Sequence, residues 1–176
     1  MALSSCSFAV MSQGDTNTIK AQFALGINSP SSSGFVGGFE SNSINFPTIN
    51  LGIQYMFSPK LGAKLDLGYN RFSNANSTPE FKTNYTRING QLVYDLSGII
   101  RFPNRIRFVT HAGPGVSIVK PLGDYGENKK TFLNGLGGIE FHYGFSDKLS
   151  FYLDTSYIFG FGKDFNSVSE GIGSFN

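Results

Sequence analysis

Apolar and polar residues alternate over runs of about ten residues, and this pattern occurs seven times along the chain of 176 residues. In the first run, Ile19 and Phe23 fall on one side of an extended strand, whereas Lys20 and Gln22 fall on the other. A period of two residues predicts a β-strand with one apolar face and one polar face. The runs cover residues 18–28, 48–57, 61–72, 85–96, 105–120, 131–145 and 149–160.

The length of these runs predicts that the strands cross a membrane. Strands of globular proteins have roughly five or six residues, whereas a tilted strand that crosses a bilayer needs about ten. The sequence contains no apolar stretch of the roughly 18 residues that a transmembrane helix needs. A closed barrel is the other structure that pairs every backbone polar group in lipid. We therefore expect an all-β fold, an up-and-down antiparallel transmembrane β-barrel.

The connectors between the runs alternate in length. Three long connectors, residues 29–47, 73–84 and 121–130, are rich in Ser, Asn and Gly, and the connectors between them are shorter. Two of the short connectors are centred on Ser-Pro-Lys at 58–60 and Ser-Asp-Lys at 146–148. Long loops at one end and short turns at the other are typical of outer-membrane barrels, whose long loops face outward from the cell.

The number of predicted strands leaves the closure of the barrel open. Bacterial single-chain barrels have an even number of strands, so seven strands do not close in the usual way. We expect an eight-stranded type in which residues 13–176 form the barrel domain, seven strands are visible and the C-terminal strand is missing. The alternative is that a segment near the ends of the chain pairs to close the barrel.

The first twelve residues resemble the remnant of a signal peptide. A weak apolar stretch precedes Val10 and Ser12, which suit positions three and one before a cleavage site. Cys6 follows Leu-Ser-Ser as in a lipobox, so acylation of Cys6 is the alternative interpretation. Because Cys6 is the single cysteine, the sequence excludes a disulfide framework and a zinc-cysteine cluster.

If the apolar faces meet lipid, the polar faces carry ionisable side chains into the lumen. The predicted lumen charge network consists of Lys64, Asp66, Arg87, Asp95, Arg107, His111, Glu140 and Asp154, and Lys20 and His142 share its parity. Buried charges are costly unless they are paired, and an eight-stranded barrel is just wide enough for side chains to fill. We expect either a static plug of ion pairs or a gate in which cations exchange partners. The strand register set by the short turns brings Glu140 close to Asp154 on the neighbouring strand, and we expect Arg87 to bridge the two carboxylates.

Several short phrases resemble the N-terminal barrel of the OmpA family, and more narrowly its Bacteroidetes members. They are QLVYD at 91–95, HAGPG at 111–115, GGIEF at 137–141 and SDKLS at 146–150, within a similarity over about residues 18–165. The resemblance implies eight strands and the outer membrane of a Gram-negative bacterium. Family members often continue into a periplasmic domain that binds peptidoglycan. This sequence shows no such domain, so peptidoglycan contact is expected only through a domain absent here.

The expected function is that of an outer-membrane anchor and envelope-integrity protein with exposed loops and outer-membrane lipid as its partner. A net charge of +2, dispersed along the chain, gives no sign of nucleic-acid binding. Neither His111 nor His142 is placed beside a serine at the membrane face, so we expect no enzyme, no catalytic residue and no cofactor. A metal site would need a third ligand that the sequence does not place. The alternative is a soluble lipocalin-like barrel whose apolar face surrounds a small hydrophobic ligand.

Overall fold

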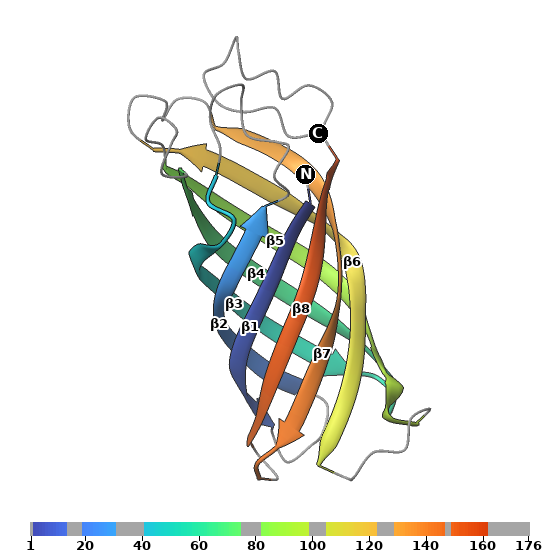
Figure 1. The fold of residues 1–176 in the computed structure, drawn as a ribbon. Coiled ribbons are helices and arrows are strands. Elements are labelled where there is room, and N and C mark those ends of the chain that lie inside the picture. The colour runs from blue at the N-terminus through green and yellow to red at the C-terminus, as the bar shows by residue number, and fades with distance from the viewer. Residues whose placement is uncertain are drawn as a thin grey trace.

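The computed structural model describes residues 2–13, 19–30, 41–74, 82–98, 105–122, 129–146 and 149–161. Eight antiparallel strands follow one another around a closed barrel (Figure 1). They are β1 (Ala2–Gln13), β2 (Ile19–Pro30), β3 (Asn45–Met56), β4 (Leu61–Ser73), β5 (Lys82–Asp95), β6 (Ile106–Pro121), β7 (Lys130–Gly144) and β8 (Leu149–Phe161). A short 3-10 helix, η1 (Leu96–Gly98), follows β5. No helix in the described ranges is long and apolar enough to cross a membrane. The predicted all-β, up-and-down architecture is confirmed.

The closing strand comes from the N-terminal end of the chain. The seven strands predicted from the sequence are β2–β8, and β1 adds an eighth that pairs with both β2 and β8. The structure therefore corrects the expectation of a gap left by a missing C-terminal strand, and shows closure by a segment near the chain ends. Residues 2–12, interpreted above as a signal-peptide remnant, lie in this strand. Four serines interrupt its apolar residues, so the alternation that marks the other strands is weak here.

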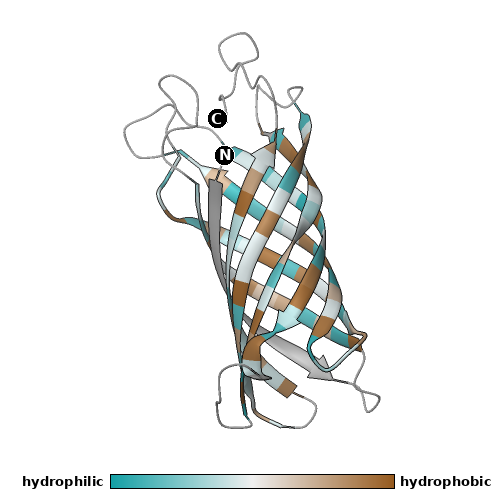
Figure 2. Ribbon diagram, turned by 90° about the vertical axis from the view of Figure 1, so that its right-hand side faces the viewer, coloured by the Kyte–Doolittle hydropathy of each residue, from teal (hydrophilic) through white to brown (hydrophobic). Residues whose placement is uncertain are grey.

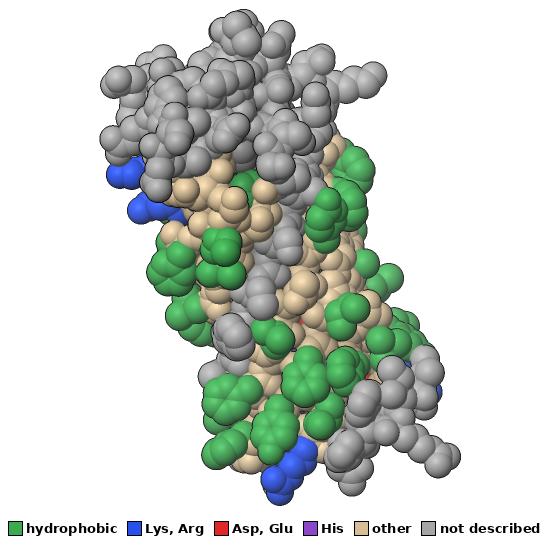
Figure 3. All heavy atoms as spheres, viewed as in Figure 1, with side chains coloured by type: hydrophobic (Ala, Val, Ile, Leu, Met, Phe, Trp, Pro, Cys, Tyr) green, Lys and Arg blue, Asp and Glu red, His purple; other side chains and the backbone are tan. Residues whose placement is uncertain are grey.

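Most apolar side chains of β2–β8 face outward and most polar side chains face inward. On β4, Leu65 is 60% exposed, whereas its neighbours Lys64 and Asp66 are 5% and 4% exposed. Apolar and polar residues alternate along the strands in Figure 2. On the face shown in Figure 3, apolar side chains lie along the wall of the barrel and Lys and Arg lie toward its ends. A lipocalin-like barrel needs the opposite orientation. The soluble ligand-binding alternative is therefore wrong.

The shortest connectors, 57–60 and 145–148, lie at one end of the barrel, here called the short-turn end, together with the connector 96–105, which contains η1. The connectors 31–44, 74–81 and 122–129 lie at the other end, here called the long-loop end. Of the aromatic residues in the long connectors predicted from the sequence, Phe46 is exposed at the start of β3, and Phe35, Phe39 and Tyr125 lie outside the described residues.

An inner apolar cluster fills the lumen toward the long-loop end. It consists of Phe72, Tyr85, Val119, Phe132, Leu136 and Ile158, all buried. The Phe72 and Tyr85 rings meet edge to face at 5.9 Å, and Tyr85 lies 6.4 Å from Phe132. Strand parity alone predicts a polar inner face, so this cluster could not be predicted from the alternation of residues. Its residues share parity with the inward polar residues.

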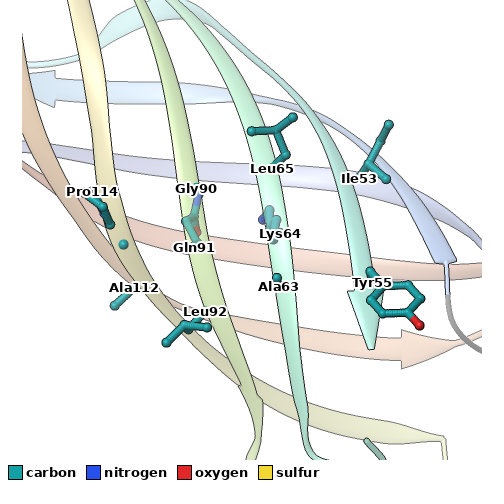
Figure 4. A pocket seen from close by; sticks show the side chains of 11 residues that line it. Ile53, Tyr55, Ala63, Lys64, Leu65, Gly90, Gln91, Leu92, Ala112 and Pro114 are labelled. Atoms are coloured by element: carbon teal, nitrogen blue, oxygen red, sulfur yellow. The ribbon is translucent and has the colours of Figure 1, made fainter. Parts of the chain in front are cut away.

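The ladder between β5 and β6 is interrupted halfway along. Pairing stops after Asn89↔Gly115 and resumes at Leu92↔Ala112 without a change of register. Pro114 has no backbone N–H to donate, and a Cβ at Gly113 would collide with the backbone of Gly90. The ladder is thus broken at Pro114 without an inserted residue. A shallow apolar hollow of about 520 Å³ lies outside this break (Figure 4).

Candidate functional site

The candidate site is the polar network in the lumen between the inner apolar cluster and the short-turn end. Strand alternation turns every second residue inward, and inward glycines leave room for the long side chains. A Cβ at Gly68 would lie 2.6 Å from Arg87 Nε, and one at Gly52 would lie 3.3 Å from Lys64 Cε. The small residues of these strands therefore allow the two cations to extend into the interior.

Lys64 and Glu140 form an ion pair between strands that are not neighbours. Lys64 Nζ on β4 lies 2.5 Å from Glu140 Oε1 on β7. Gln22 on β2 donates a weaker hydrogen bond to Glu140 Oε2 at 3.4 Å and another to Gln54 Oε1 at 3.2 Å. Both charged side chains are buried away from water. Each therefore needs the opposite charge of the other for its stabilisation.

Arg87 belongs to a second ion pair. Its Nη1 donates to Asp66 Oδ2 on the neighbouring β4, and its Nη2 donates to Asn50 Oδ1 on β3 at 2.9 Å. The planar guanidinium thus links three strands, as its fork of donors allows. The prediction that Arg87 bridges Glu140 and Asp154 is wrong, because Asp66 lies closer on the adjacent strand and Lys64 reaches Glu140.

Glu140 and Asp154 are register partners on β7 and β8, as the turn register predicts. His142 Nε2 lies 2.7 Å from Glu140 Oε2, and its ring stacks on Tyr152 with centroids 5.4 Å apart. His111 Nε2 lies 3.4 Å from Asp154 Oδ1. Both histidines are buried. The structure thus brings five ionisable side chains into one layer of the lumen: Lys64, His111, Glu140, His142 and Asp154.

Two members of the predicted network lie apart from this layer. Asp95 is half-buried at the short-turn end, where its Oδ1 accepts a hydrogen bond from Ser97 N at 2.8 Å. Arg107 is also half-buried there, opposite His142 in the register. Lys20 is buried on β2 toward the same end. Asp95, Arg107 and Lys20 thus lie near the ends of their strands, away from the central ion pairs.

A layer of neutral polar side chains lies beside the inner apolar cluster, and sequence reasoning did not single it out. Asn89 Nδ2 donates to Asn134 Oδ1 at 2.5 Å, and Asn134 Nδ2 donates to Ser117 Oγ at 2.7 Å. The Tyr85 hydroxyl lies 2.6 Å from Ser117 Oγ. The parity of these residues was visible in the sequence, but their connections depend on the register across three strands.

Comparison with known families decides what kind of barrel this is. The model of the outer membrane protein beta-barrel domain matches residues 1–172. The chain belongs to the outer membrane protein beta-barrel domain family. As an outer membrane barrel it lies in the outer membrane of a Gram-negative bacterium, with its apolar outer face toward lipid. The resemblance to outer-membrane barrels inferred from the sequence is thereby confirmed.

Solved structures of outer membrane proteins are similar to this outer membrane barrel. OprG from Pseudomonas aeruginosa is 10% identical, with a TM-score of 0.48, over 98% of this chain and 94% of OprG. Ail, the attachment invasion locus protein of Yersinia pestis, solved in complex with the heparin analogue sucrose octasulfate, is 16% identical with a TM-score of 0.39. That match covers 90% of this chain and 99% of Ail. No curated protein sequence matches the chain.

Proposed function

We propose that this outer membrane barrel is a non-enzymatic membrane anchor that supports envelope integrity, and that its lumen conducts little or no solute. The observation that carries the proposal is the buried ion pair of Lys64 and Glu140, which crosses the lumen from β4 to β7. The neutral polar layer and the inner apolar cluster lie above this pair toward the long-loop end. An interior of this width is filled by such side chains.

The arrangement of the histidines supports a role without catalysis. His111 and His142 are buried inside the lumen, away from the lipid-facing surface on which a lipid-modifying enzyme would bind its substrate. Ser156 Oγ donates its hydrogen bond to Asp154 Oδ1 at 2.5 Å, so it is oriented toward a carboxylate. A nucleophilic serine would instead donate to a histidine base.

Solute flux through reconstituted vesicles tests the closed lumen. We expect vesicles that contain the folded barrel to retain a trapped small sugar as well as protein-free vesicles do, whereas a porin releases it. Release at a rate proportional to the amount of folded barrel would contradict the proposal.

Complementation tests the role in the envelope. A Gram-negative host that lacks the gene should become more sensitive to detergent and to bulky antibiotics, and the wild-type gene should restore resistance. Leu65→Arg, which places a charge on the lipid face, is the matched control and should not restore it. Equal resistance with and without the gene would contradict the anchor proposal.

A further inference from the structure

We propose that the lumen contains a binding site for a divalent transition metal, formed by His111, Glu140 and Asp154. One ligand atom from each residue lies within 4.8 Å of the other two, and all three residues are buried. They belong to β6, β7 and β8, which are consecutive neighbours in the barrel wall. Imidazole nitrogen and carboxylate oxygen are protein ligands of Zn²⁺. The third ligand that the sequence did not place is thus supplied by strand register.

The hydrogen bond of His111 to Gln91 determines which ring nitrogen is available. His111 Nδ1 lies 2.5 Å from Gln91 Oε1, and Gln91 Nε2 faces Asp66 Oδ2 at 3.4 Å, which orients the amide. An amide oxygen only accepts hydrogen bonds, so Nδ1 carries the proton. Histidines that bind metals commonly donate their other N–H to such an oxygen, which fixes the tautomer. Nε2 is therefore the ligand atom.

The surroundings of His111 Nε2 require a cation. This buried atom has no hydrogen-bond partner among the described residues, and it lies 3.4 Å from Asp154 Oδ1. The lone pair of a neutral imidazole would face the lone pairs of a carboxylate, so either a proton or a metal ion must lie between them. Metal bonds of about 2.0–2.1 Å in a tetrahedral site separate neighbouring ligand atoms by about 3.3–3.4 Å. The observed separation fits that geometry.

Hydrogen bonds from outside the site hold both carboxylates. Ser156 Oγ donates to Asp154 Oδ1 at 2.5 Å, and His142 Nε2 lies 2.7 Å from Glu140 Oε2. Such outer contacts orient the ligands of protein metal sites. Glu140 Oε1 has a second lone pair, so this atom can bind a metal while it keeps its bond to Lys64.

Gly138 leaves space beside the proposed site. A Cβ at this position would lie 2.6 Å from both His111 Nε2 and Ser156 Oγ. Lys64 pairs with Glu140, and Asp154 forms no ion pair with a Lys or Arg in the described part of the chain. A divalent cation would supply the missing charge.

Metal retention after refolding tests the site. The untagged barrel is stripped with a chelator, refolded in detergent with Zn²⁺ or Co²⁺, and separated from excess metal by gel filtration. We expect about one metal ion per chain and, with Co²⁺, the visible absorption of a four-coordinate site. Asp154→Asn and His111→Gln should lower the retained metal about tenfold or more. Asp95→Asn, which removes the same charge from a carboxylate outside the site, is the control and should retain as much metal as wild type.

A measurement on the wild-type barrel does not depend on whether these variants fold. In NMR spectra of the histidine rings, one equivalent of Zn²⁺ should shift the Nε2 resonance of His111 through direct bonding and leave the His111 Nδ1 proton in place. Retention of both ring protons of His111 after zinc addition would show that a proton occupies the gap, and would overturn the proposal. Absence of stoichiometric metal in the folded wild type, or equal retention by folded Asp154→Asn, would also overturn it.

Discussion

Lys64 Nζ lies 2.5 Å from Glu140 Oε1, and this contact joins β4 to β7, two strands that share no backbone hydrogen bonds. Backbone ladders connect each strand only to its neighbours. The ion pair therefore connects two parts of the barrel wall that no backbone ladder joins. Its two side chains also fill part of the lumen. Both side chains are buried, so the loss of either one leaves an unpaired charge in the lumen.

A charge on the lipid face should prevent stable insertion. Leu65 is 60% exposed on the outer face of β4, near the middle of the strand. Leu65→Arg should destabilise the folded barrel by about 2–4 kcal/mol, because an arginine at the bilayer midplane is costly. Folding yield in lipid vesicles, read from the gel mobility of unboiled samples, measures the effect. Phe57→Arg, at the short-turn end, is the matched control and should cost about 0–1 kcal/mol. Similar yields for both variants and wild type would contradict the membrane orientation.

Arg87 should couple to Asp66 and not to Glu140. Arg87→Ala leaves the Asp66 carboxylate buried without its cation, and we expect a loss of about 3–5 kcal/mol. Adding Asp66→Asn should recover part of this loss, whereas adding Glu140→Gln should not, because Lys64 neutralises Glu140. Urea unfolding of the three variants in detergent, followed by far-ultraviolet circular dichroism because the chain has no Trp, measures the difference. Recovery by Glu140→Gln alone would indicate a different arrangement of the ion pairs.

Removal of the N-terminal strand should open the barrel. Without residues 2–13, β2 and β8 each lose their partner, and unpaired backbone groups in lipid cost several kcal/mol each. We expect the shortened chain to lose the heat-resistant monomer band in detergent and to form oligomers through its two free edges. Replacement of residues 2–13 by an unrelated strand of alternating polarity provides the control and should restore the monomer. A stable monomer of the shortened chain would show that β1 is dispensable for closure.

The orientation of the strands could be predicted from the sequence because residue parity determines which side chains share a face. Lys64, Asp66, Arg87 and Glu140 were assigned to the lumen on parity alone, and the structure places all four inside. Register partners such as Glu140 and Asp154 followed from the short turn between β7 and β8.

Partner choice in the lumen could not be predicted, because it depends on the curvature of the closed barrel. Lys64 and Glu140 are 76 residues apart, and only closure brings β4 opposite β7. The residues of the proposed metal site are also brought together by the folded sheet, because His111 on β6 reaches Asp154 on β8 across Gly138 of β7. The inner apolar cluster could not be predicted because Phe72 and Phe132 occupy positions whose parity predicts polar residues. The closing strand β1 was missed because its serines obscure the alternation.

A double-mutant cycle on Lys64 and Glu140 tests the central claim most directly. Lys64→Met and Glu140→Gln keep the size of each side chain and remove its charge. Lys64→Met should cost about 3–5 kcal/mol of unfolding free energy, and the double variant should lose clearly less than the sum of the two single losses. Lys60→Met, at an exposed turn lysine, is the control and should change stability by less than about 0.5 kcal/mol. A double variant whose loss equals the sum of the single losses would show that the two residues do not interact, and would contradict the account of a lumen closed by paired charges.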